Sequence, residues 1–248
     1  MKRGGRGARS SGIAREDRGK AVWLRLPERL SEADAQRLSD EAEELRFRPE
    51  LCVVVLMPSA RDFCLGIEES ERRFVDCVRA VASLPQPVLA VLRGRTAARG
   101  CELALACDLR VASADARFFF PGPGDAGGLG FGAIQRLVRL VGPSRALGMM
   151  LRERPVGAAE ALRAGLVSRV CRASALRGEV RRLVSELSAK APLALRLAKE
   201  AVYRGLELTL EQGLRLEDDL YVLLQTTRDR KEGIRSFMSG RRPRFVGA

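Results

Sequence analysis

Two short segments contain the residues whose types and spacing could do chemistry. The first spans residues 61–68 and reads RDFCLGIE, and the second spans residues 94–108 and reads GRTAARGCELALACD. Each follows an apolar run that predicts a buried strand, so each loop lies where α/β folds build their sites. Gly100 opens a predicted helix, whose first N–H groups and positive dipole end point outward. Two such N–H groups converging on one point would form an oxyanion hole for a carbonyl oxygen that gains negative charge.

The residue types that are missing restrict this chemistry. The chain contains no histidine, which excludes Ser-His-Asp and Cys-His catalysis and every His-liganded metal site, so no metal is expected. The six cysteines include no CxxC pair and indicate free thiols in a reducing compartment such as the cytoplasm. We interpret Cys64, Cys101 and Cys107 as small core residues, because no histidine is present to activate them. The longest apolar run, residues 51–57, is strand-sized, so no membrane span is expected.

The positive charge is concentrated at the two ends of the chain. The formal net charge is +13, of which residues 1–20 carry +5 and residues 228–248 carry another +5. The body between them carries only +3 and is nearly neutral. Basic tails can attract nucleic acid or an acidic protein, but solvated tails are the commoner case. Nucleic-acid binding is therefore not expected.

The sequence divides into three parts. Residues 1–20 are rich in Gly, Arg and Ser and are predicted to be disordered. Residues 21–172 alternate predicted strands and helices, which is typical of an α/β domain. Residues 173–248 are predicted to be helical, with breaks near Pro192, Gly205 and Gly233.

Apolar periodicity and turn signals place the elements of the core. The predicted strands span residues 21–26, 51–57, 88–92, 109–114 and 166–170. One predicted helix begins after the N-cap Ser31 and runs to about Phe47, and others span residues 69–84, 101–107 and 133–141. Residues 121–132, PGPGDAGGLGFG, are predicted to form a loop of special backbone conformation.

Further motifs extend the pattern of the two loops. They are FCLG at residues 63–66, GCELA at 100–104, CDLR at 107–110, QRL at 135–137, VG at 141–142, AEA at 159–161, AGLV at 164–167, Phe237 and RRPRF at 241–245. In these motifs the chain resembles the crotonase (enoyl-CoA hydratase/isomerase) superfamily. The match covers residues 51–170 without an obvious gap and resumes at the C-terminus.

The resemblance implies a spiral of ββα units with a C-terminal helical region that builds a homotrimer or hexamer. It implies an acyl-CoA or acyl-carrier-protein thioester as substrate, with CoA or phosphopantetheine as part of that substrate and no separate cofactor. The thioester oxygen would lie between the backbone N–H groups of Leu65 and Arg99, where an enolate is stabilised. The residues implied in contacts to substrate or CoA are Phe63, Cys64, Gly66, Gly100, Gly130, Phe237 and Arg241.

The chain also departs from the pattern of the family it resembles. Hydratases of the family use two glutamates, and Glu102 matches the first, whereas Gly122 stands at the position of the second. Asp125, three residues later, is a candidate second carboxylate, although an aspartate in such a loop more often bonds its own backbone. Arg99 replaces a usual glycine. Its side chain either turns to solvent or faces a substrate carboxylate or a CoA phosphate.

Efficient hydration needs one carboxylate to activate water and another to deliver a proton. With Glu102 alone, isomerase or decarboxylase chemistry on a thioester enolate is favoured, as in crotonase-like decarboxylases of polyketide pathways. Two alternatives stay open. The chain could be a non-catalytic subunit that binds a thioester or supports a partner enzyme, or it could bind RNA through its basic tails, as one crotonase homologue does.

Overall fold

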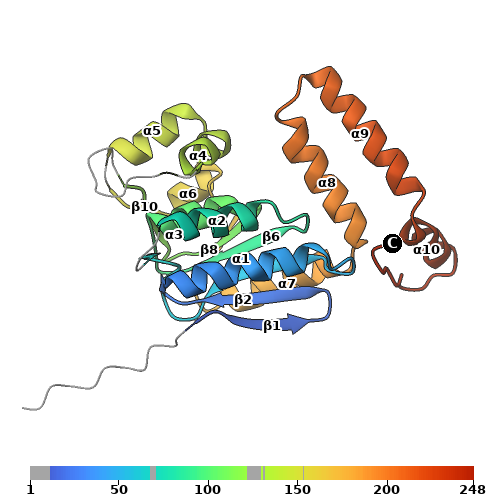
Figure 1. Cartoon of the computed structure of the whole chain (residues 1–248), viewed down its shortest axis with the longest axis horizontal. Helices are drawn as coiled ribbons and strands as arrows, with labels where there is room; N and C mark the ends of the chain where they lie inside the picture. The colour runs from blue at the N-terminus through green and yellow to red at the C-terminus, as the bar shows by residue number, and fades with distance from the viewer. Residues whose placement is uncertain (1–11, 68–70, 122–129, 131, 153) are drawn as a thin grey trace, which may run out of the picture.

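A six-stranded sheet forms the centre of the computed structural model, which describes residues 12–67, 71–121, 130, 132–152 and 154–248 (Figure 1). The strand order is β1-β2-β4-β6-β8-β11, and every neighbouring pair except β1 with β2 is parallel. The strands are β1 (Ala14–Arg18), β2 (Ala21–Leu26), β4 (Val53–Pro58), β6 (Val88–Leu92), β8 (Leu109–Ser113) and β11 (Arg169–Cys171). Because the chain adds one strand at a time in one direction, the carboxyl ends of β2, β4, β6 and β8 lie along one edge.

Each long parallel strand is followed by a short strand and then, for the first three, by a helix. The short strands are β3 (Arg29–Leu30), β5 (Gly66–Ile67), β7 (Arg95–Ala97) and β9 (Arg117–Phe119), and the helices are α1 (Glu32–Arg46), α2 (Glu71–Ala82) and α3 (Arg99–Ala106). The short strands pair with one another, β3 with β5 and β7 with β9, in sheets of their own. The repeated unit is therefore ββα, and the prediction of a spiral of such units is confirmed.

The two faces of the six-stranded sheet are covered by different helices, since neighbouring residues of a strand point to opposite faces. Val54 and Leu56 of β4 pack into the larger core together with residues of α1, α2 and α3. Val53 and Val55 face the other way, into a smaller core closed by α7 (Leu176–Ser188). Both faces are apolar, which explains why residues 51–57 read as one continuous apolar run.

The remaining helices follow the core. They are α4 (Ala133–Val141), α5 (Pro143–Leu151), α6 (Ala158–Ala164), α8 (Pro192–Gly205), α9 (Leu210–Gln225) and α10 (Arg228–Met238), and the short strand β10 (Val156–Gly157) pairs with β9. Helices α8 and α9 form a hairpin that reaches away from the core, and α9 buries no residue within this chain. No described helix has the length and apolar content needed to cross a bilayer.

Several predicted boundaries agree closely with the structure. Ser31 caps α1 by accepting from the Asp34 N–H at 3.1 Å, while the Asp34 carboxylate accepts from the Ser31 N–H at 3.0 Å. Two predictions are wrong in detail. Gly233 lies inside α10 rather than at a break, and the strand predicted over residues 166–170 is β11, at Arg169–Cys171. Hydrogen bonds from Leu166 and Val167 to Ala161 keep those two residues in the turn that ends α6.

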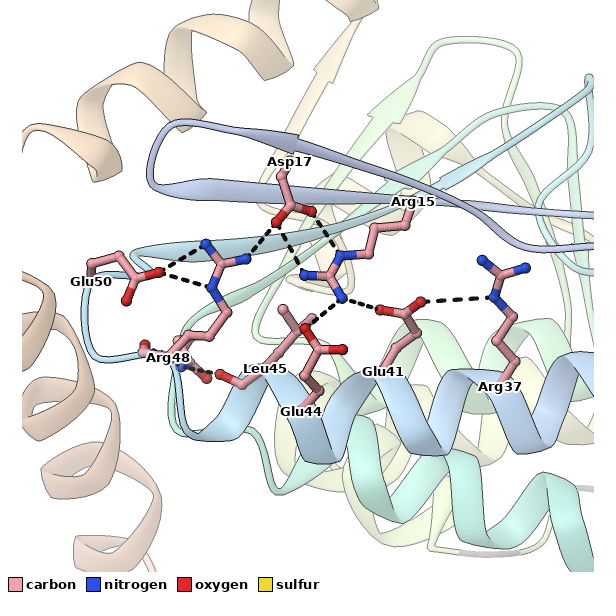
Figure 2. A network of polar contacts seen from close by, with 9 residues as sticks. Arg15, Asp17, Arg37, Glu41, Glu44, Leu45, Arg48 and Glu50 are labelled. Atoms are coloured by element: carbon pink, nitrogen blue, oxygen red, sulfur yellow. Dashed lines mark hydrogen bonds and ion pairs between the residues drawn. The ribbon is translucent and has the colours of Figure 1, made fainter.

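The predicted disordered N-terminus also needs a correction. Residues 1–11 lie outside the described part of the chain, but residues 14–18 form β1, an antiparallel partner of β2. Four of its five residues are charged, which is typical of a solvated tail, yet Arg15 and Asp17 pair with charges on other elements. Arg15 contacts Glu41 and Glu44 of α1, each at 2.8 Å, and Asp17 contacts Arg48 at 2.5 Å (Figure 2).

We expect the ion pairs of Asp17 to make the free energy of unfolding depend on pH. The hydrogen bond from Arg15, together with that from Arg48, lowers the pKa of Asp17 from 3.8 to about 2. A carboxylate with a lowered folded-state pKa stabilises the fold above its unfolded value, and that contribution is lost as pH falls through the folded value. The melting temperature of Asp17→Asn should therefore lie below that of the wild type at pH 6, and the gap should close between about pH 4 and pH 2.

Asp40→Asn is the matched control for this titration, because Asp40 lies on α1 and accepts a hydrogen bond from the uncharged Gln36. Its gap to the wild type should stay small across the same range. A gap for Asp17→Asn that is independent of pH would contradict the assigned role of the network.

Candidate active site

The two loops singled out in the sequence are joined to each other at the carboxyl ends of β4 and β6. The Phe63 N–H donates to the Arg95 carbonyl at 2.9 Å. Asp62, only 7% exposed, accepts from the Arg95 N–H at 2.8 Å and from its Nε at 2.9 Å. We call these contacts of Asp62 and Phe63 with Arg95 the clasp. It was not predicted from the sequence, although an aspartate beside the FCLG motif and an arginine directly after Gly94 were visible signals. The clasp fixes the distance between the two loops.

Gly100 is the point of closest approach between the loops. A Cβ atom at this position would lie 1.8 Å from the Cys64 carbonyl oxygen and 2.8 Å from that of Phe63. Only glycine allows the first turn of α3 to pack directly on the backbone of the first loop. Gly100 thus joins the two loops by a backbone contact, and its predicted contact with substrate stays a prediction.

Two non-glycine residues of the site have a left-handed backbone. Cys64 has a φ of 42° and Ala98, immediately before α3, has a φ of 38°. Such conformations cost on the order of 1–3 kcal/mol each and persist only where surrounding contacts enforce them. Here the clasp and the Gly100 contact supply that enforcement. Strain of this kind gathers at active sites, and both residues lie beside the predicted oxyanion donors.

Glu102 lies in the first turn of α3 and is the buried carboxylate of the site, with a side chain that is 1% exposed. Its Oε1 accepts from Arg99 Nη1 at 2.7 Å and from the Gly130 N–H at 2.8 Å. The structure therefore brings together three of the predicted residues, Glu102, Arg99 and Gly130. The Arg99 side chain is 9% exposed, so it is turned into the protein rather than toward solvent.

Leu65 is held differently from what an oxyanion donor requires. Its N–H donates to the Glu28 carbonyl at 2.6 Å, which extends the pairing of β3 with β5 by one step. In this conformation the N–H is engaged within the chain and does not await a ligand. The Arg99 N–H belongs to the first residue of α3, at the positive end of the helix dipole. A thioester would have to displace the Glu28 carbonyl before Leu65 could serve as predicted.

Phe63 and Cys64 were predicted to contact substrate, but their side chains belong to the core. Both residues are 0% exposed, so neither side chain faces a ligand in this conformation. Burial raises the pKa of the Cys64 thiol to about 12 and that of Cys107 to about 12, and it raises the pKa of Cys101 as well. These thiols are protonated at neutral pH, which confirms their interpretation as core residues. The backbone of Gly66 pairs with Arg29 in the short β3–β5 ladder.

The other end of α3 is fixed by Arg110, which is 6% exposed. Its Nε donates to the Leu166 carbonyl at 2.7 Å and its Nη1 to the Cys107 carbonyl at 2.5 Å. Burial lowers the pKa of this guanidinium, while its hydrogen bonds go to carbonyl groups at the negative end of the helix dipole. Arg110 thereby holds α3, and with it Glu102, in one position on the sheet.

Phe237 and Arg241 are not part of this constellation within one chain. Phe237 lies on α10 and Arg241 just after it, and Figure 1 shows α10 at the opposite end of the molecule from α3. Phe237 is 88% exposed, and Arg241 pairs with Glu232 at 2.6 Å. Their contact with CoA stays a prediction; within one chain, the α8–α9 hairpin carries α10 away from α3.

Asp125 and Gly122 lie outside the described residues, so the predicted second carboxylate and its replacement have no structural account. Within the described part of the chain, no group of three or more acidic or cysteine side chains is placed to hold a metal ion.

Comparisons with known proteins agree with this arrangement. Residues 31–248 match the family model described as enoyl-CoA hydratase/isomerase. The chain is 33% identical to the 2,3-dehydroadipyl-CoA hydratase of Escherichia coli, across 95% of this chain and 98% of the relative. It is likewise 33% identical to the (E)-benzylidenesuccinyl-CoA hydratase of Thauera aromatica, across 92% and 95%.

Solved structures give the same result. An enoyl-CoA hydratase from Bacillus anthracis superposes with a TM-score of 0.87 at 29% identity, covering 95% of this chain and 99% of that one. One from Mycobacterium smegmatis superposes with a TM-score of 0.83 at 31% identity, covering 94% and 98%. The clasped loops, the glycine contact beneath them and the buried glutamate thus occur in a chain that belongs to the enoyl-CoA hydratase/isomerase family of the crotonase superfamily.

Proposed function

We propose that this protein acts on an acyl thioester through an enolate, with isomerisation or decarboxylation favoured over efficient hydration. The observation that carries the proposal is the pairing of Glu102 with Arg99 and the Gly130 N–H inside a buried site. A carboxylate held by a cation and a backbone donor is an acid or base in a fixed position. It is the one carboxylate of the family pattern that this sequence retains.

The pairing with Arg99 supports proton transfer to carbon more than activation of water. One carboxylate oxygen of Glu102 already accepts two hydrogen bonds, and the position of the second hydratase glutamate is a glycine, Gly122. Hydration needs both groups to act on one water, whereas an enolate needs oxyanion stabilisation and one proton donor or acceptor. Glu102 is assigned that proton-transfer role. The backbone N–H groups of Leu65 and Arg99 are proposed as the oxyanion donors, which requires the Leu65–Glu28 bond to open.

In a decarboxylation, the acyl group of the thioester carries a carboxylate on its α-carbon and loses it as CO₂. The bond between the α-carbon and the carboxylate of the acyl group breaks, CO₂ leaves, and the electron pair forms the enolate. A proton from solvent, passed through Glu102, then adds to the α-carbon. The buried guanidinium of Arg99 gives a site that would attract such an acyl carboxylate.

We further propose that the protein works as a homotrimer or hexamer on acyl-CoA or an acyl-carrier protein. The support is the exposed apolar surface of α9, which includes Leu210, Leu214, Tyr221, Val222 and Leu223. In an oligomer, Phe237 on α10 of one copy and Arg241 just after it can serve the site of another copy. Sedimentation of the full chain checks the first part, and a purely monomeric species at micromolar concentration would contradict it.

The function itself is tested with the purified full chain, crotonyl-CoA and a panel of malonyl-type and glutaconyl-type thioesters. CO₂ release or double-bond migration should exceed hydration on every substrate. Hydration at ordinary enzyme rates would overturn the proposed preference. Retained CoA binding without turnover of any thioester would favour a non-catalytic thioester-binding subunit, an alternative that the engaged Leu65 N–H also supports.

A further inference from the structure

A second hollow lies on the face of the sheet that α7 covers, away from Glu102. It opens at the carboxyl ends of β2, β4 and β6, and its volume is about 300 Å³. Trp23 and Val91 point to this face, where they pack in the core beneath Leu176 and Val180 of α7. The helix α3, which carries Glu102, packs into the core on the opposite face. The sheet therefore separates this hollow from the candidate active site.

The rim of the hollow is strongly basic. Five arginines line it, and the only acid beside them is Glu16; the arginines are Arg18, Arg25, Arg93, Arg177 and Arg181. Glu16 pairs with Arg18 at 2.6 Å and with Arg25 at 3.2 Å. The hydrogen bond from Arg18 lowers the pKa of Glu16, and the charges of Arg25 and Arg177 lower it further. The Glu16 carboxylate is thus the counter-charge for several guanidinium groups, so the rim of the hollow keeps a net positive charge.

Three of these arginines are not neutralised by the chain. Among the described residues, Arg93, Arg177 and Arg181 have no carboxylate within ion-pair distance. By contrast, Arg182 on the same helix pairs with Glu179 and Glu186. Convergence of unpaired guanidinium groups around one hollow is costly through mutual repulsion and is relieved by a bound anion.

Two further donors occur at the same place. Helix α7 begins at Leu176 beside the hollow, and its N-cap Ala175 has no side chain that could accept from the first N–H groups. The positive end of that helix dipole therefore adds to the arginine charge. Trp23 is 7% exposed, and its indole Nε1 has no hydrogen-bond partner among the described residues. Because Nε1 is itself buried, only the first N–H groups of α7 are offered to a ligand with acceptor oxygens in the hollow.

The walls between these donors are apolar. Trp23, Met57, Val91, Leu176 and Val180 line the hollow below the arginines. A volume of about 300 Å³ is at the lower end for ligand sites, so it suits a chain of moderate length rather than a whole CoA molecule. The combination of an apolar floor and a guanidinium rim describes an amphipathic anion.

We propose that this hollow binds a free carboxylic acid with a medium-length apolar chain, its carboxylate held by Arg93 and Arg177 and its chain lying against Trp23. Guanidinium groups suit a carboxylate because they donate two parallel hydrogen bonds in a planar fork. The apolar chain gains the free energy of leaving water. This site is independent of the thioester chemistry proposed for Glu102.

The test uses octanoate and the full chain, and Trp23 makes it local because it is the single tryptophan of the protein. Octanoate should change the Trp23 fluorescence with a saturable dependence, and equilibrium dialysis with labelled octanoate should give the same dissociation constant. Acetate lacks the chain and octanol lacks the charge, so both should bind about tenfold more weakly or worse. Saturating CoA should leave octanoate binding unchanged, since the sheet separates the two sites.

The double variant Arg93→Gln/Arg177→Gln should weaken octanoate binding about tenfold or more, because each charge-assisted bond contributes about that factor. Arg79→Gln is the matched control, since Arg79 is an exposed arginine of α2, a helix that packs on the other face of the sheet. Absence of saturable binding in dialysis would overturn the proposal. So would equal binding by the double variant and the wild type, or competition by CoA.

Discussion

Replacing Glu102 with glutamine is expected to lower turnover of the thioester substrate by about 10²- to 10⁴-fold, the usual contribution of a positioned acid or base. Glutamine keeps the shape of the side chain, and its amide oxygen can still accept from the Gly130 N–H and from Arg99. What it loses is the ability to move a proton. CoA binding should therefore stay within about twofold of the wild type, because the site is not reshaped.

The variant also leaves the Arg99 cation buried without its anion, which costs on the order of 3–5 kcal/mol when a buried pair is broken. Thermal unfolding measured beside the kinetics separates the two effects. Glu160→Gln is the matched control, since Glu160 is also a first-turn helix acid that pairs with an arginine, Arg154, but on the surface. It should leave turnover and stability nearly unchanged. Unchanged turnover in Glu102→Gln would exclude the assigned role and favour a non-catalytic subunit.

Gly100→Ala should disrupt both stability and activity. Its Cβ would lie 1.8 Å from the Cys64 carbonyl oxygen, and all three of its nearest neighbours are backbone atoms that no rotamer change can move. The first turn of α3 must then separate from the FCLG loop by more than 1 Å. We expect a loss of about 1–3 kcal/mol or more in the free energy of unfolding. Misplacing catalytic groups by about 1 Å costs about 10²-fold in rate, so activity should fall by at least that factor.

The control for this change is the same substitution at Gly148 in α5, where a Cβ meets no atom within 4 Å. Alanine there should be neutral or should stabilise the protein by up to about 1 kcal/mol, through helix propensity alone. Denaturant unfolding and steady-state kinetics of both variants give the comparison. If Gly100→Ala behaves like Gly148→Ala, the close packing of the two loops is not what positions the site.

The amino-acid sequence alone located the long buried strands, the start of α1 and the resemblance to the family, but not β1 or the short strands β3, β5, β7 and β9. Continuous apolar runs at residues 51–57 and 88–92 indicate strands buried on both faces, because local composition reports burial directly. Ser31 with Asp34 marks the start of α1, since a capping box depends only on residues three apart. The motifs FCLG and GCELA locate the two loops and single out Glu102 and Gly100. Each of these features depends on residues that are close together in the sequence, so the sequence is sufficient to predict it.

The enclosure of individual side chains and the contacts between distant residues depend on the tertiary structure. Arg99 could have faced solvent or a ligand, and its pairing with Glu102 depends on how tightly the first turn of α3 is enclosed. The Leu65 N–H is engaged because β3 and β5 pair across a long stretch of sequence. Phe237 and Arg241 are predicted to contact CoA, and only the direction of the α8–α9 hairpin shows that α10 and α3 lie at opposite ends of one chain.

The charged N-terminal strand β1 is a further feature that depends on the tertiary structure and not on a local sequence pattern. Residues 14–18 have the composition of a solvated tail, and nothing local predicts a strand there. They are ordered because Asp17 meets Arg48 and Arg15 meets Glu41, partners some 30 residues away that become neighbours only once α1 packs beside the sheet (Figure 2). Hydrogen bonding and burial within a segment can be read from its own residues. The pairing of charges across the fold depends on the geometry of the whole chain, and that geometry also decides which of the predicted site residues meet.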